Sequence, residues 1–147
     1  RGQFDLELPV LAGKSAACMI RRKVFVDIGM FDPSYEILGE ETDLAWRVWL
    51  SGYQVFYVPS SVTYHAFGTR FKPADMYTNQ RVYENGSRNY LSMLFTNLGT
   101  KSLIMIIPFH FIVWLFAGIG MIFRGKYSAG THIFKGLKSF LAISSSS

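Results

Sequence analysis

Short apolar stretches, each broken by glycine, proline or a charged residue, indicate alternating strands and helices in the first 72 residues. Ala16 to Ile20 is apolar and predicts a strand. Tyr53 to Val58, rich in β-branched and aromatic residues, predicts another that Pro59 closes. Val62 to His65 is long enough for a further short strand. Because helices are predicted between these strands, the pattern predicts an α/β fold.

Two helices are predicted within the same part of the chain. Lys23 to Ile28 predicts a short helix that ends at Gly29, since glycine readily adopts the left-handed conformation that terminates helices. A longer helix follows and is predicted to end at Ser51-Gly52. Negative charge in a first turn is favoured by the helix macrodipole by about 0.3–1 kcal/mol per residue. Three acids occupy that turn of the longer helix: Glu40, Glu41 and Asp43.

Beyond residue 72 the spacing of apolar residues predicts long helices. Pro73 is predicted to open the first of them. Its apolar positions recur at helical spacing: Met76, Tyr83, Tyr90, Leu94 and Leu98. Ser102 to Phe123 is a run of 22 residues without formal charge, enough to cross about 30 Å of hydrocarbon. Tyr127 to Ile143 predicts an amphipathic helix suited to the membrane interface.

Positive charge is confined to the second part of the chain. The 147 residues carry a net charge of +5, but residues 1–84 sum to −1 and residues 85–147 to +6. Cationic residues beside an apolar segment usually contact anionic headgroups, so a membrane surface is the predicted partner and nucleic acid is not. Half of the residues are hydrophobic, which excludes a disordered chain, and the lone Cys18 excludes an internal disulfide framework.

These patterns together predict three segments. Residues 1–72 form part of an α/β domain, residues 73–99 an amphipathic linking helix, and residues 100–147 a membrane helix with an interfacial amphipathic tail. The chain begins at Arg1 and shows no signal-peptide pattern. We therefore expect it to be a piece of a longer protein.

The acids of the longer helix are the main candidates for chemistry. In the simplest interpretation Asp43 pairs with Arg47 four residues later, and the glutamates only favour the helix start. Alternatively, they follow a glycine-containing loop at the edge of an α/β layer, where ligands commonly bind. His65 comes 24 residues after Glu41. An isolated histidine is more often structural, although acids with a histidine also suit a divalent metal.

Several short motifs in this part of the chain indicate a known family when their order and spacing are taken together. They are Ser15-Ala16-Ala17, Ile20-Arg21-Arg22, Ile28-Gly29-Met30-Phe31-Asp32, Gly39-Glu40-Glu41-Thr42-Asp43-Leu44-Ala45-Trp46-Arg47, Ser51-Gly52-Tyr53, Val58-Pro59 and Tyr64-His65. In this order and spacing, over about residues 10–72, the chain resembles the C-terminal half of inverting family 2 glycosyltransferases. The resemblance implies a GT-A, Rossmann-like domain followed by amphipathic and membrane-embedded helices. Arg88-Asn89-Tyr90 and Arg124-Gly125-Lys126 resemble the membrane-associated tail of many such enzymes.

The resemblance also implies an activity and roles for residues. The family transfers a sugar, here a hexosyl or deoxyhexosyl group, from a nucleotide-sugar donor to a glycan or lipid-linked acceptor, as in polysaccharide biosynthesis. The second acid of the family motif is the usual general base, a role that falls on Glu41. Because glutamate replaces the commoner aspartate there, Glu40 is the alternative base. Asp43 and Arg47 are expected to hold the helix and loop together. His65 matches a family histidine that helps to bind a divalent metal, Mg or Mn.

Two further residues are weaker acceptor-side candidates. Asp32 lies in a predicted turn, and Trp46 lies three residues before Trp49 on one helical face, where it stacks on a sugar or packs in the core. The family's donor site also needs an Asp-x-Asp motif in a preceding nucleotide-binding half, and these residues contain no such motif. We therefore expect the donor-binding half to be missing, and the chain alone to be inactive.

The predicted membrane segment has two possible arrangements. A single crossing with the catalytic part in the cytosol places Arg124 and Lys126 outside, against the positive-inside tendency. A kink at Pro108 would instead keep both flanks of the segment on one face, a monotopic arrangement that fits the charges better. His110 is a second residue that a plain anchor does not need. A single crossing with the catalytic part outside fits the charges too, but a nucleotide-sugar donor is usually cytosolic. We therefore expect the catalytic part to be held at the cytoplasmic side of the cell membrane.

Two other classes of function are compatible with the residues. A non-catalytic membrane-anchored adaptor would use the acids only to stabilise a helix. A metal-dependent hydrolase would use the same acids with His65, but it needs further ligands that residues 1–72 do not obviously supply. Replacing Glu41 by glutamine distinguishes a catalytic from a structural carboxylate.

Overall fold

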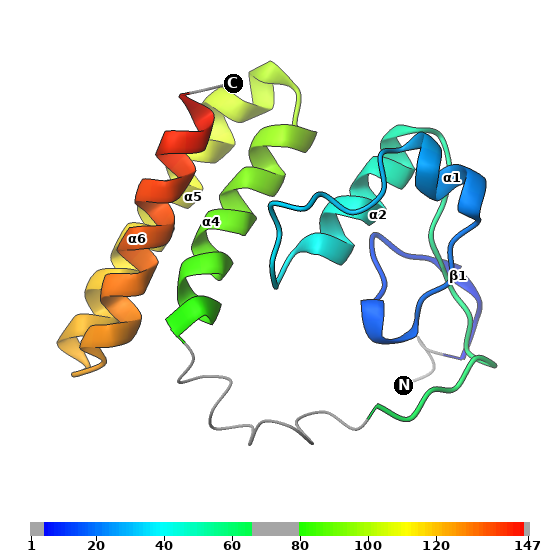
Figure 1. Cartoon of the computed structure of the whole chain (residues 1–147), viewed down its shortest axis with the longest axis horizontal. Coiled ribbons are helices and arrows are strands. Elements are labelled where there is room, and N and C mark those ends of the chain that lie inside the picture. The colour runs from blue at the N-terminus through cyan, green and yellow to red at the C-terminus, as the bar shows by residue number, and fades with distance from the viewer. Residues whose placement is uncertain (1–4, 66–79, 146–147) are drawn as a thin grey trace. The chain divides into compact units, whose positions relative to one another are not determined.

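The computed structural model describes residues 5–65 and 80–145, which fall into two compact units (Figure 1). Unit 1 comprises Arg1–Ser34 and Glu40–Phe67, and unit 2 comprises Tyr35–Gly39 and Gly68–Ser147. Predictions for Pro73 and Met76 lie outside the described residues.

The predicted α/β, Rossmann-like fold is wrong. Of the described residues, 63% are helical and 3% are in strands. The sheet has two strands, β1 (Leu8–Pro9) and β2 (Phe56–Tyr57), paired antiparallel with Leu8 opposite Tyr57. Strand propensity creates a strand only where a second strand offers hydrogen bonds. Beyond these four residues the pairing continues by one backbone hydrogen bond, from Val10 N–H to the Val55 carbonyl at 2.8 Å, and the described ranges contain no further strand.

The other two predicted strands are absent for the same reason. Ala16 to Ile20 overlaps a single 3₁₀ turn, η1 (Ser15–Ala17), and Cys18 after it is extended but does not belong to a sheet. Val62 to His65 forms no regular element. Within the predicted Tyr53 to Val58, only Phe56 and Tyr57 pair.

Both predicted helices of unit 1 are confirmed. Helix α1 (Arg22–Asp27) is followed by Gly29 at a φ of +86°, a left-handed conformation that favours glycine. Helix α2 (Glu40–Leu50) starts at the predicted acids and is followed by Gly52 at a φ of +81°. Their apolar faces form the buried core of this unit: Val24, Leu44, Ala45 and Val48.

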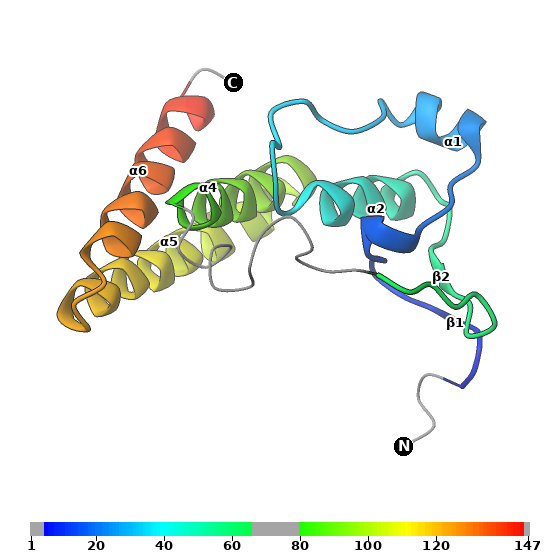
Figure 2. The ribbon, with the colours of Figure 1, turned by 60° about the horizontal axis from the view of Figure 1, so that its bottom comes forward.

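Unit 2 contains three long helices that pack against one another (Figures 1 and 2). They are α4 (Gln80–Asn97), α5 (Thr100–Phe123) and α6 (Tyr127–Ser144). Their core consists of Leu91 from α4 with Ile133, Leu137 and Phe140 from α6. The apolar stripe of α6 is therefore covered by protein. Because this stripe is covered, only the other faces of α6 are free to contact the membrane interface that the sequence predicted for this helix.

Glycine allows α4 and α6 to approach closely. Ser87 Oγ on α4 donates a hydrogen bond to the Ile133 carbonyl on α6 at 3.1 Å. A Cβ atom at Gly136 would collide with Ser87 Oγ and with the Glu84 carbonyl oxygen. A side chain at this position would therefore force the two helices apart.

Two polar contacts attach other segments of unit 2 to α4. Asn89 Nδ2 donates to the carbonyls of Ile37 and Leu38, at 3.0 and 2.7 Å. The Tyr90 hydroxyl lies 3.0 Å from His110 Nδ1 on α5. The otherwise unexplained histidine in the apolar run therefore has a partner on α4.

Helix α5 is long enough and apolar enough to cross a membrane. It has 24 residues and remains helical through Pro108. Gly118 is its one buried residue, because most of its surface is not covered by α4 or α6.

Candidate functional site

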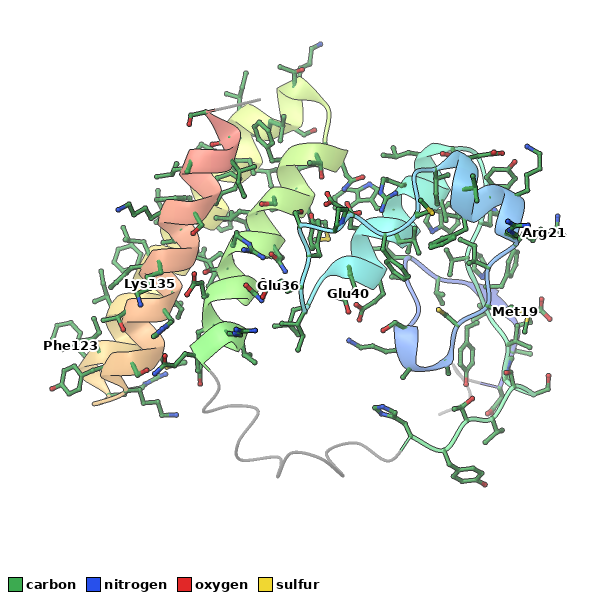
Figure 3. All side chains as sticks on the ribbon, in the orientation of Figure 1. Met19, Arg21, Glu36, Glu40, Phe123 and Lys135 are labelled. Carbon is green, nitrogen blue, oxygen red and sulfur yellow. The ribbon has the colours of Figure 1, made fainter. Side chains whose placement is uncertain are left out.

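The predicted carboxylates lie together in the first turn of α2, but they differ in environment. Glu40 and Glu41 are half-buried and Asp43 is buried. Figure 3 shows Glu40 at the start of the helix. The negative charges stand at the positive end of the helix dipole, as the sequence predicted.

Asp43 is occupied by a structural ion pair. Arg47 Nε and Nη2 both donate to Asp43 Oδ2, at 2.9 and 2.7 Å. Arg47 Nη1 also donates to the carbonyl of Ile28 at 2.6 Å. The pair thus ties α2 to the end of α1, and it confirms the simple interpretation of the i,i+4 spacing. Because Asp43 is bound to Arg47 in this way, we do not expect it to act as a base or as a metal ligand.

Glu41 has a partner that sequence reasoning missed. Its Oε1 lies 3.3 Å from Lys14 Nζ, an ion pair between residues 27 positions apart. The Glu41 side chain is 14% exposed, whereas that of Lys14 is 89% exposed. No periodicity connects a loop lysine with a distant helix, so the sequence carried no signal for this contact.

Glu40 is the carboxylate whose protonation the structure shifts. Burial raises the pKa of Glu40 above its usual value, and the neighbouring charge of Glu41 raises it further. A backbone hydrogen bond and the charge of Lys14 act in the opposite direction. Its Oε2 atom is buried without a hydrogen-bond partner in the part of unit 1 that the structure describes. A raised pKa makes a carboxylate a stronger base.

The described part of the chain does not form a metal site. His65 is exposed and follows β2 without regular structure. Among residues 5–65 and 80–145, no three side chains of the His, Cys, Asp and Glu types gather closely enough to hold a metal ion. Glu41 and Asp43 are each bound to a cation of the protein. These residues alone therefore do not fit the Mg or Mn ion that the resemblance implies.

The weaker acceptor-side candidates have mainly structural surroundings. Asp32 Oδ1 accepts a hydrogen bond from the backbone N–H of Ser34 at 2.8 Å, which is an Asx turn. Trp46 is half-buried. Its neighbour Trp49 donates from Nε1 to the carbonyls of Val10 and Leu11, each at 3.2 Å, and so fastens the segment after β1 to α2.

Unit 1 also contains an open pocket that sequence reasoning missed. Its volume is about 800 Å³. Two of the residues that line it are strongly exposed, since Met19 is fully exposed and Phe56 is 48% exposed. In Figure 3 the labelled Met19 and Arg21 lie away from Glu40. The predicted carboxylates do not line it, which separates the pocket from the acidic turn. Among its lining residues are Met19, Arg21, Val24, Val48, Tyr53 and Phe56.

Comparisons of the chain with family models, with curated proteins and with solved structures find no match.

Proposed function

We propose that this chain supplies the general base and the acceptor side of an inverting glycosyl transfer at a membrane. The transferred group is a hexosyl or deoxyhexosyl group from a nucleotide sugar, and the acceptor is a glycan or a lipid-linked saccharide. The motifs quoted above support the class of reaction. The observation that carries the proposal is the pair of adjacent, half-buried carboxylates, Glu40 and Glu41, in the first turn of α2.

The proposed chemistry requires a carboxylate that accepts a proton. An acceptor hydroxyl is a poor nucleophile at neutral pH, so Glu41 takes its proton as the oxygen bonds to the anomeric carbon. The bond from that carbon to the nucleotide's phosphate oxygen breaks in the same step, and the nucleoside diphosphate leaves. The exposed Lys14 holds the Glu41 carboxylate in position. Glu40 is the alternative base, because its pKa is raised by burial and by Glu41.

Other components of the proposal lie outside the described residues. The donor-binding half and the Mg or Mn ion that the resemblance implies stay predictions. His65 is the residue of this chain that the resemblance assigns to the metal site, and the described residues do not bring two further ligands of the His, Cys, Asp or Glu types to it. Because nucleotide sugars are made in the cytosol, we place the carboxylates at the cytoplasmic side of the cell membrane.

Replacing the carboxylates one at a time in the complete enzyme tests the proposal. Glu41→Gln keeps the size of the side chain but removes the base, so kcat should fall by about 100-fold or more. KM for the donor should stay unchanged, since the donor is bound elsewhere. Glu7→Gln is the matched control, because Glu7 is an exposed carboxylate of the same unit.

The two single variants also show which of Glu40 and Glu41 is the general base. A loss with Glu40→Gln and not with Glu41→Gln would transfer the base role to Glu40. Normal turnover of both variants would refute the proposal. It would favour the adaptor function instead. In that case the ion pairs of Glu41 and Asp43 would serve only to stabilise the fold.

A further inference from the structure

Helix α5 presents a continuous apolar stripe that α4 and α6 leave exposed. Met105, Phe109, Ile112, Phe116 and Phe123 recur at helical spacing and are 77, 63, 50, 66 and 87% exposed. Its opposite side, with Ile107, Phe111 and Trp114, packs against the core of unit 2. An exposed apolar stripe of this length marks a surface that contacts lipid or protein.

The other two helices of unit 2 turn polar stripes outward. On α6 the exposed positions Thr131, Lys135 and Lys138 follow helical spacing. On α4, Arg81 is exposed and Arg88 is half-buried. Figure 3 shows Phe123 on α5 and Lys135 on α6. The three-helix unit is therefore apolar along α5, and charged side chains stand on the outer sides of α4 and α6. The ends of α6 also expose Tyr127, Leu141 and Ile143.

Contacts between the helices show how far along the length of α5 each charged side chain lies. A Cβ atom at Gly86 would lie 3.9 Å from Trp114, and Tyr90 contacts His110. Arg88 lies between Gly86 and Tyr90, so it stands level with the middle of α5. If α5 crossed a bilayer with α4 beside it, this guanidinium would lie near the centre of the hydrocarbon, where charge is strongly disfavoured.

On α6, Lys135 and Lys138 would also be placed in the hydrocarbon if the bundle crossed a bilayer. The side chain of Phe134 packs against Gly118, which lies five residues before the last residue of α5. Leu137 and Phe140 reach the core that Ile107 and Phe111 join. Lys138 lies between those two core residues in sequence and is exposed. A crossing bundle would therefore expose this ammonium group to hydrocarbon as well.

The positive charge of unit 2 indicates which kind of membrane surface it binds. Residues 80–145 contain seven lysines and arginines and a single acid, Glu84. The turn between α5 and α6 combines Arg124 and Lys126 with two exposed aromatic residues, Phe123 and Tyr127. Cationic and aromatic side chains beside an apolar helix are typical of contact with anionic headgroups.

We propose that unit 2 lies within one leaflet of an anionic phospholipid membrane and that α5 does not cross it. The apolar stripe of α5 enters the hydrocarbon, while the polar stripes of α4 and α6 face headgroups and water. The two ends of α5 then lie on the same face of the membrane. The proposal depends on the membrane association proposed above and is independent of sugar transfer.

Cysteine labelling of the full chain in sealed membrane vesicles tests the orientation. In a Cys18→Ser background, Lys101→Cys and Lys126→Cys place single thiols at the two ends of α5, where both lysines are exposed. A membrane-impermeant maleimide should label both variants from the same side. Labelling from opposite sides would establish a crossing and overturn the proposal.

A third thiol tests the apolar stripe directly. Phe109→Cys should be protected from the impermeant maleimide until detergent is added, because residue 109 lies in the middle of the stripe. Reaction in intact vesicles would show that the stripe is not in lipid. That result would overturn the proposal whatever the two end positions show.

Binding to vesicles of defined composition tests the choice of lipid and separates the two proposals. The purified chain should bind vesicles containing phosphatidylglycerol more tightly than vesicles of phosphatidylcholine alone. Lys135→Gln and Lys138→Gln should each weaken binding to the anionic vesicles by about fivefold. Lys23→Gln is the control, because that exposed lysine belongs to unit 1 and pairs with Asp27.

Each outcome of the binding experiment has a separate meaning. Equal affinity for neutral and anionic vesicles would overturn the anionic part of the proposal. No binding to either kind of vesicle would refute membrane association itself. Normal turnover of both Glu40→Gln and Glu41→Gln in the complete enzyme, together with the expected labelling and binding, would refute only the catalytic proposal.

Discussion

The acidic residues at the start of α2 show how neighbours decide what a carboxylate does. Asp43 is buried and receives two hydrogen bonds from Arg47, so it holds α1 and α2 together. Glu41 is held by Lys14, and Glu40 retains a buried oxygen without a partner in the described part of unit 1. Three identical charges in one turn therefore have three different environments. The Asp43–Arg47 pair was predictable from spacing, whereas the Lys14 contact was not.

The raised pKa of Glu40 predicts a pH dependence of stability. Burial favours the neutral carboxyl, with a contribution from Glu41. The folded state therefore holds this proton more tightly than the unfolded state. The stabilisation is complete below the unfolded pKa of about 4.3 and is lost as pH rises through the folded value. Glu40→Gln should remove this decline, so its stability relative to the original chain should increase from acidic to neutral pH.

Denaturant unfolding at several pH values checks this prediction. Trp46 and Trp49 report on unit 1 when Trp114 of unit 2 is replaced by phenylalanine. Glu7→Gln is the control, since Glu7 is exposed. Parallel pH profiles for Glu40→Gln and the original chain would contradict the prediction.

The helices of unit 2 illustrate a constraint that belongs to pairs of elements. Apolar spacing identified the buried side of α6, but it did not show that Gly136 lies against α4. A Cβ atom there meets a hydroxyl and a backbone carbonyl, Ser87 Oγ and Glu84 O. Likewise, His110 looked out of place in an apolar run until Tyr90 was found 3.0 Å away.

Gly136→Ala should therefore destabilise the contact between α4 and α6. Overpacking of a close interface typically costs about 1–3 kcal/mol, and the backbone carbonyl at Glu84 has little freedom to move. Gly120→Ala is the matched control, because a Cβ atom there meets no atom within 4 Å. That substitution should be neutral or stabilising by up to about 1 kcal/mol, since alanine favours a helix interior more than glycine does. Thermal unfolding in detergent, followed by circular dichroism, compares the two variants. Equal stability would show that the helices readjust without loss.

The whole chain separates charge and hydrophobicity between its two ends. Residues 85–147 carry a net charge of +6 and the apolar α5, whereas residues 1–84 carry −1. Two different forces should therefore contribute to membrane association. Attraction to anionic lipids is screened by salt, and burial of the apolar stripe is not.

Salt titration separates these two contributions. Raising the salt concentration should weaken binding of the whole chain to phosphatidylglycerol-containing vesicles, because the Debye length falls from about 10 Å at 0.1 M to about 3 Å at 1 M. Binding to phosphatidylcholine vesicles should change little, since only the α5 stripe contributes there. Sedimentation with vesicles measures both. Binding to anionic vesicles that is independent of salt would show that the cations do not face the headgroups.

Amino-acid order alone was sufficient for features that act within a few residues. Gly29 and Gly52 ended helices where predicted, and the acids marked the start of α2. The uncharged run from Ser102 became the core of a helix long enough to span a membrane. Such signals succeed because backbone conformation and helical spacing depend on neighbours in the chain.

Long-range contacts were settled only by the folded chain. Strand-like sequence predicted an α/β layer, but a strand needs a partner distant in sequence, and in the described ranges the sheet is limited to Leu8–Pro9 and Phe56–Tyr57 with one adjoining hydrogen bond, from Val10 N–H to the Val55 carbonyl. The ion pair of Lys14 with Glu41 and the approach of Gly136 to Ser87 likewise join residues far apart. No local pattern encodes these contacts, because each depends on where separate segments meet in space.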